Sequence, residues 1–278
     1  MNSANSFAEE KQDKSWPESH LGVNILNTKE AVIEALARTV FDHGALNNEF
    51  YRRWPSTPMK LHEVEIFARN YWARTRRTAM IVALSLLRAK PLSARVEIVK
   101  SIYSELGCGD AKRAHSVRLQ NYLLDLPSRL ARRTYTVNEL EAGQVLTSTS
   151  LFIEEQDALY APEGQGHPSS LVLGALLAQE WLAYSMLTHL YEGARNYQYL
   201  YSDNDEFHGQ CEYFYIHIGE AEKSHKVQSI TAAALECHSE EDLVGLTTGF
   251  NRFLDITEAY WNGIAGAIEG VGELDANI

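Results

Sequence analysis

The sequence predicts an all-α protein. Strand signals are nearly absent, because no run of alternating β-branched residues is bounded by Asn-Gly or Asp-Gly turns. Apolar residues instead recur three or four positions apart, as Val64, Phe67 and Tyr71 do, which places them on one face of a helix. Apolar residues make up 45% of the 278 positions, enough to bury a full core. We therefore expect a bundle of helices.

Capping residues, glycines and prolines divide the chain into expected helices. Thr28 and Asp110 are suitable helix starts, whereas Gly44, Gly107 and Pro127 are suitable ends. The expected helices span about 28–43, 61–88, 91–107, 110–126, 136–157, 169–197, 208–236 and 240–268. Residues 160–170 are rich in Gly, Pro and Ser and predict a loop. The segment 169–197 is apolar on nearly all sides, so we expect it at the centre of the bundle.

Composition restricts the setting of the protein. Residues 1–20 are polar with mixed charge, so we expect a disordered N-terminal tail followed by a single helical domain over residues 21–278. The net charge of −12 argues against nucleic acid as a partner. The longest unbroken apolar run, 79–84, is too short to cross a membrane. Three cysteines form no disulfide framework, which favours the cytoplasm.

The run HGQCEYFYIHIGEAEKSHKVQ, residues 208–228, combines imidazoles and carboxylates on an expected helix. Such donors suit iron, manganese or zinc. Glu222 and His225 are three positions apart and share a helix face. His217 lies five positions before Glu222, out of phase for a regular helix, but a bulge at Gly219 would bring it round. The alternative is a solvated charged face with one core histidine.

Two further segments contain candidate ligands. Glu105 and His115 are ten positions apart, about 15 Å along a straight helix. A kink at Gly107 would let both turn inward, although the same residues also suit a plain helix end followed by a new cap. Glu180 lies in the middle of the most apolar helix, where a buried carboxylate requires an arginine, a proton or a metal. Helical bundles build di-iron sites from such inward-facing groups, and this set is too large for a structural zinc site with four ligands.

Several segments resemble the heme-oxygenase-like di-iron oxidases and oxygenases. They are IYSELGCGDAKRAHSVRL (102–119), ALLAQEWLAY (175–184), and EYFYIHIGEAEKSH (212–225) followed by FLDITEAYW (253–261). The resemblance covers roughly residues 47–261 in the same order. It implies a heme-oxygenase-like bundle of about seven helices without heme, which binds two Fe(II) ions per chain and uses O2 as co-substrate and an external electron donor.

The resemblance also implies a ligand set. The catalytic metal ligands would be Glu105, His115, Glu180, Glu222 and His225. The family pattern, His-x3-Asp/Glu-x2-His, requires a histidine where this chain has Ile218. The nearest histidine, His217, is one residue early and is the sixth expected metal ligand.

The expected activity is O2-dependent oxidation or oxygenation of a small substrate in specialised metabolism. We favour an amine or amino acid, because an inward arginine on the helix expected at 61–88 would hold a carboxylate. The candidates are Arg69, Arg74, Arg76 and Arg77. One alternative is oxidative decarboxylation of a fatty acid on the same di-iron site. Others are a metal-free helical oxidase, a thiaminase-like enzyme with a nucleophilic cysteine, or a non-enzymatic all-α interaction protein. The long apolar-faced helix at 61–88 is compatible with a homodimer.

Overall fold

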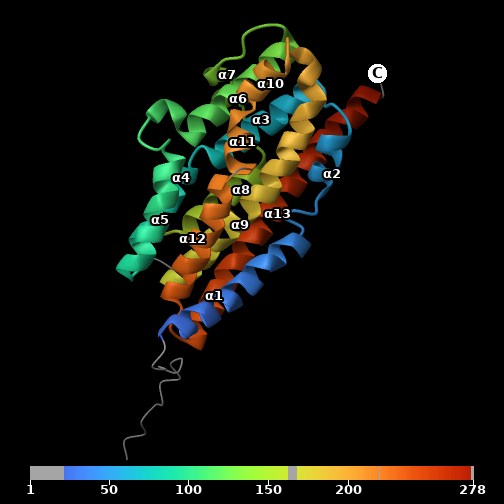
Figure 1. Cartoon of the computed structure of the whole chain (residues 1–278). Helices are drawn as coiled ribbons and strands as arrows, with labels where there is room; N and C mark the ends of the chain where they lie inside the picture. Colours follow the sequence, from blue (N-terminus) through green and yellow to red (C-terminus); the bar gives the residue numbers. More distant parts are fainter. Residues whose placement is uncertain (1–21, 162–167, 219, 277–278) are drawn as a thin grey trace, which may run out of the picture.

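The chain folds into an elongated bundle of helices (Figure 1). The computed structural model describes residues 22–161, 168–218 and 220–276, with side chains for 28–161, 168–218 and 224–270. Within these ranges the regular structure is helical and no β-strand is present, which confirms the all-α prediction. The tail expected at residues 1–20 lies outside the described residues.

The helices follow one another with short connections. Their order is α1 (Gly22–Arg38), a 3-10 helix (Thr39–Asp42), α2 (Glu49–Ser56), α3 (Leu61–Thr75), α4 (Thr78–Arg88), α5 (Leu92–Glu105), a 3-10 helix (Ala111–Arg113), α6 (His115–Ala131), α7 (Val137–Ala142), α8 (Thr147–Leu159), α9 (Ser169–Ala194), a 3-10 helix (Arg195–Leu200), α10 (Asn204–Gln210), α11 (Glu212–Ile218), α12 (Glu220–Glu236) and α13 (Glu240–Ala276).

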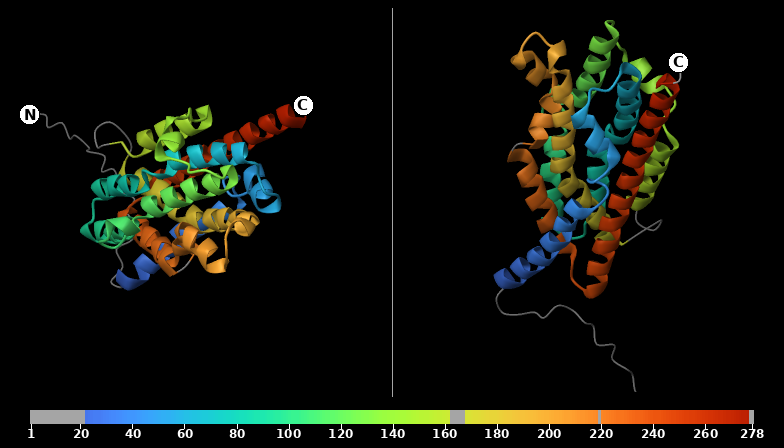
Figure 2. Two further views of the ribbon diagram at one scale, coloured as in Figure 1. Left: turned by 90° about the horizontal axis from the view of Figure 1, so that it is seen from above. Right: turned by 90° about the vertical axis from the view of Figure 1, so that its right-hand side faces the viewer.

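Helix α9 forms the centre of the bundle, as its apolar sequence predicts. Helices α2, α11, α12 and α13 all pack against it, and α13 runs along most of the bundle (Figure 2). By length and composition the helical stretch Ser169–Leu200 would suit a membrane span, but 72% of its most apolar 18-residue window is buried inside the bundle. This burial is what a core helix requires, and it places Glu180 among packed helices.

Glycines set the close approach of α9 and α13. A Cβ on Gly174 of α9 would overlap the backbone carbonyl of Leu246, and one on Gly249 of α13 would overlap that of Leu171. Because no side chain separates the two backbones there, the helices meet at a short distance. This contact fixes the position of α9 relative to its neighbours.

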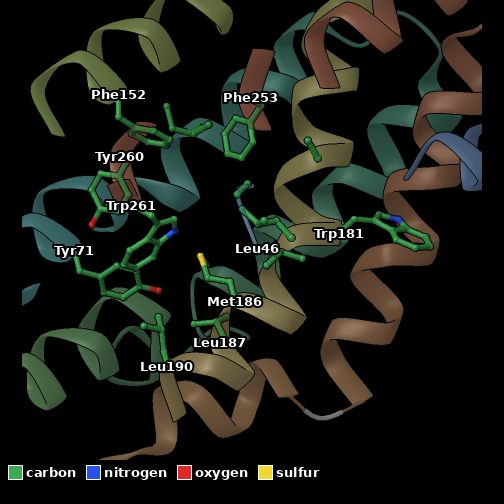
Figure 3. Close-up of a cluster of buried hydrophobic side chains, with 14 of the residues drawn as sticks. Leu46, Tyr71, Phe152, Trp181, Met186, Leu187, Leu190, Phe253, Tyr260 and Trp261 are labelled. Atoms are coloured by element: carbon green, nitrogen blue, oxygen red, sulfur yellow. The ribbon is translucent and has the colours of Figure 1, made fainter. Parts of the chain in front are cut away.

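An aromatic cluster fills the core beside α9. Phe50 of α2 stacks on Trp261 of α13 with ring centroids 4.8 Å apart. Figure 3 shows Trp261 close to Tyr71, with Met186 of α9 directed towards them, whereas Trp181 points away. Aromatic pairs of this kind add about 0.5–1.5 kcal/mol beyond the area they bury.

The prediction of a single helix over residues 61–88 is wrong. Helix α3 ends at Thr75 and α4 begins at Thr78, although neither glycine nor proline marks the break. The guanidinium of Arg76 instead bonds Glu141 of α7 at 2.9 Å, and that of Arg77 bonds Asp157 of α8 at 3.1 Å. Tertiary ion pairs therefore accompany this break, and the local sequence carries no signal for it.

The prediction that a helix ends at Pro127 is also wrong, because α6 continues to Ala131. A proline inside a helix removes one backbone hydrogen bond and costs about 3 kcal/mol. The hydroxyl of Ser128 donates to the Leu124 carbonyl at 2.6 Å, and both Leu123 and Leu126 are buried. Apolar burial on this face offsets the cost of the proline.

Candidate metal centre

A tight turn brings Glu105 and His115 together. Glu105 ends α5 and His115 begins α6. Between them Gly107, Cys108 and Gly109 have φ angles of 82°, 56° and 93°, so the chain reverses direction. A Cβ on Gly107 would lie 2.6 Å from the Ala114 nitrogen, which makes glycine necessary at that position. As a result His115 Nδ1 lies 3.1 Å from Glu105 Oε1, which is the arrangement that a kink at Gly107 would allow.

His217 of α11 completes a three-residue cluster with Glu105 and His115. Its Nε2 lies 3.8 Å from Glu105 Oε1, and its ring centroid lies 4.4 Å from that of His115. Candidate ligand atoms of the three residues all lie within 4.8 Å of one another. The one-residue offset from the family pattern therefore does not keep His217 from the site. Residue 219, where a bulge is expected, lies outside the described residues.

The orientation of His217 is fixed by the backbone. Its Nδ1 donates a hydrogen bond of 2.7 Å to the carbonyl oxygen of Tyr213, one turn earlier. Nδ1 therefore carries a proton, and in the neutral imidazole the lone pair is on Nε2, which lies towards Glu105. Bonds of this kind set the tautomer of metal-binding histidines.

Glu180 and His225 form a second buried pair. Glu180 Oε2 on α9 lies 3.4 Å from His225 Nδ1 on α12, and the two residues are 6% and 4% exposed. Among the described residues no arginine pairs with Glu180. The side chain of Glu222, the remaining predicted ligand, lies outside the described residues.

One cavity joins the pair to the cluster. It is partly open to solvent and is lined by Glu105, His115, Glu180, His217 and His225. The charge of His225 also acts on the pKa of His115. The structure thus brings five of the six predicted residues, from five helices, to one place.

Electrostatics favour the forms of these groups that bind metals. Burial opposes ionisation of Glu105, but hydrogen bonds and charges from His115 and His217 outweigh it and hold its pKa well below the usual range. Burial lowers the pKa of His115, against the opposing effect of Glu105. A carboxylate and neutral imidazoles are the ligating forms. These donors fit a metal ion of the iron, manganese or zinc type, and three protein ligands leave positions open for substrate.

The cysteines stand apart from this cavity. None of the three, all of which are described, contributes to its lining. Burial raises the pKa of the Cys211 thiol to about 12, and Cys108 lies exposed in the turn after α5. Neither is placed as a nucleophile for the cavity, which weakens the thiaminase-like alternative.

Two tyrosines at the site were not expected from the sequence. Tyr213 lines the cavity, and its hydroxyl lies 3.5 Å from that of Tyr71. Burial raises the pKa of both phenols, so both stay protonated. Tyr213 lies four positions before His217, and this spacing was the only signal for it.

Comparison with models of protein families and with curated proteins finds no match. Solved structures do match. A CADD-like protein of unknown function from Nostoc punctiforme is 16% identical with a TM-score of 0.66, over 89% of this chain and 98% of that chain. A TenA homolog from Pseudomonas syringae is 11% identical with a TM-score of 0.62, over 87% and 90%.

A third structure names the fold. A domain of unknown function with a heme oxygenase-like fold, from Shewanella denitrificans, is 14% identical with a TM-score of 0.58 over 90% of this chain and 94% of that one. At such identities the likeness shows the fold alone. The chain therefore has a heme-oxygenase-like all-α fold, as the sequence predicts.

Proposed function

We propose that the protein is an O2-dependent non-heme di-iron oxidase or oxygenase that acts on a small substrate, an amine or amino acid. The observation that carries this proposal is the burial of two carboxylate–imidazole groups in one cavity. Glu105, His115 and His217 would hold one Fe(II) ion. Glu180 and His225, with Glu222 as the family resemblance implies, would hold the second. When bound, the irons supply the electrons that activate O2, and an external donor restores them.

The protein residues have separate roles in this scheme. The Tyr213 carbonyl orients the ring of His217, and burial keeps Glu180 away from bulk water. The protonated hydroxyl of Tyr213 offers a hydrogen-bond donor inside the cavity. Apolar walls formed by Phe152 and Phe253 limit the access of water to a bound substrate.

An anaerobic titration with Fe(II), followed by exposure to air, tests the proposal. We expect about two irons per chain, an ultraviolet absorbance change on aeration, and O2 uptake with amines or amino acids. His115→Ala and His217→Ala should each lose iron. His189→Ala is the control, since that histidine is stacked on Tyr51 at 5.1 Å and is not among the cavity residues.

Two results would contradict this assignment. Absence of iron uptake by the wild-type protein would favour a metal-free enzyme or an interaction protein on the same fold. Turnover of lauric acid without turnover of any amine or amino acid would keep the di-iron site but replace the substrate class by fatty acids.

A further inference from the structure

One buried cation in the cavity has no anionic partner among the described residues. Arg74 of α3 lines the cavity and is only 8% exposed. Within the described part of the chain its guanidinium forms no ion pair, and its buried Nε has no hydrogen-bond partner. A buried arginine is normally paired, because an unpaired charge away from water is costly.

The contacts that Arg74 does make are weak. Its Nη1 lies 3.7 Å from the sulfur of Met186. Its Cζ lies 4.7 Å from the ring centroid of Phe152 and 5.1 Å from that of Tyr260. In Figure 3 these three side chains lie in one neighbourhood beside α9. Cation–π contacts hold the guanidinium in place, but they do not neutralise it.

Two arginines that follow Arg74 in the chain, by contrast, have carboxylate partners. Arg76 pairs with Glu141 at 2.9 Å, and Arg77 pairs with Asp157 through a bidentate contact. Both of those arginines lie at or near the protein surface. Of these three neighbouring arginines, only Arg74 is buried and without a carboxylate.

A second buried polar side chain lines the same cavity. Gln156 of α8 is 5% exposed, lines the same cavity, and lies one helical turn after Phe152, over which Arg74 is placed. Within the described residues, the side-chain amide of Gln156 makes no hydrogen bond. The amide nitrogen is therefore available to donate to a ligand at this end of the cavity.

Arg74 is also close enough to the candidate metal centre to serve it. The charges of Arg74 and Glu105 both act on the hydroxyls of Tyr71 and Tyr213, whose pKa values are raised mainly by burial. All of these residues except Tyr71 line the one cavity. A small molecule held at Arg74 would extend past the tyrosines towards Glu105 and its two histidines.

We infer that Arg74, assisted by Gln156, binds the carboxylate of a small organic substrate. This assignment rests on the proposed function, since it places the rest of the substrate towards the metal ligands. The planar guanidinium matches a carboxylate with two parallel hydrogen bonds. Phe152, Phe253 and Leu187 line the cavity and suit an apolar or aromatic body. The substrate class is thus a carboxylic acid and not a simple amine.

Binding measurements on the full-length protein without added iron test this inference. Calorimetry would compare 3-phenylpropionate with 3-phenylpropionamide, a pair that differs only in the charged group, and would then use L-phenylalanine and laurate. We expect the carboxylate to bind at least about tenfold more tightly than the amide. Tighter binding of L-phenylalanine than of laurate would identify amino acids as the source of the carboxylate, and the reverse would identify fatty acids.

Substitutions assign the effect to Arg74. Arg74→Met keeps the length of the side chain and should lower carboxylate affinity to that of the amide, whereas Arg74→Lys should lower it partially. Arg77→Met is the matched control, because Arg77 does not line the cavity, and it should bind like wild type. Without ligand, Arg74→Met should melt at or above the wild-type temperature, since it removes an unpaired buried charge.

The results separate this inference from the di-iron proposal. Equal binding of the amide and the acid, wild-type affinity in Arg74→Met, or no binding of any acid up to about 10 mM would overturn the role of Arg74. Fe(II) uptake by Arg74→Met should equal that of wild type. If the wild-type protein takes up no iron but still prefers the carboxylate to the amide, the di-iron centre is contradicted and the role of Arg74 is not.

Discussion

The turn between α5 and α6 can be tested by adding one methyl group at either of two glycines. Gly107 and Gly109 both have positive φ angles, 82° and 93°, so alanine at either position costs about 1–2 kcal/mol. A Cβ on Gly107 would also overlap the Asp110 carbonyl and lie 2.6 Å from the Ala114 nitrogen. A Cβ on Gly109 would meet only the Tyr103 hydroxyl, at an ordinary 3.6 Å.

The two variants should therefore differ in stability and in metal binding. Overpacking against backbone adds about 1–3 kcal/mol, so Gly107→Ala should lose about 2–5 kcal/mol and Gly109→Ala about 1–2. Because relief of the overlap moves the start of α6, Gly107→Ala should also displace His115 and weaken Fe(II) binding, which Gly109→Ala should retain. Urea unfolding and iron titration measure the two effects. Equal losses of stability, or wild-type iron binding in Gly107→Ala, would refute this account of the turn.

Two further predictions concern groups outside the cavity. At about pH 8 iodoacetamide should alkylate the exposed Cys108 but not Cys211, because burial raises the pKa of the Cys211 thiol to about 12. Mass spectrometry of the labelled peptides measures this difference. Rapid labelling of Cys211 in the folded protein would contradict it. The pKa of Glu206 is lowered to about 2 by the backbone N–H of Ser202 and by Arg129. A depressed acid stabilises the fold above its unfolded pKa and loses this contribution as the pH falls through its folded value. The urea midpoint of Glu206→Gln should therefore lie below that of wild type at pH 6 and approach it towards pH 3, and a gap that widens on acidification would disprove the shift.

Elements with a strong local pattern were predictable. Helix α9 was recognised because its apolar residues leave only a few polar positions, and Glu180 was conspicuous among them. The break at Arg76 was not predictable, because partners on α7 and α8, far along the chain, accompany it. The helix through Pro127 was missed because burial, which a local rule does not include, outweighs the proline.

The candidate site was predictable in composition but not in geometry. Spacing alone left Glu105 and His115 about 15 Å apart, and only the sequence of positive φ angles joins them. His217 was out of phase with Glu222, yet it reaches the cluster from α11. Arg74 could not be distinguished from the arginines near it, since its inward direction depends on how α3 packs on α8 and α13.

The central claim is that buried carboxylates and imidazoles of this cavity hold two iron ions. Anomalous diffraction at the iron edge, from crystals of the full chain loaded anaerobically with Fe(II), tests it most directly. We expect two peaks, one within about 2.0–2.4 Å of Glu105, His115 and His217, and one at the same distance from Glu180 and His225. Crystals soaked to saturation that show no peak in this cavity, or a peak only at surface carboxylates, would contradict it.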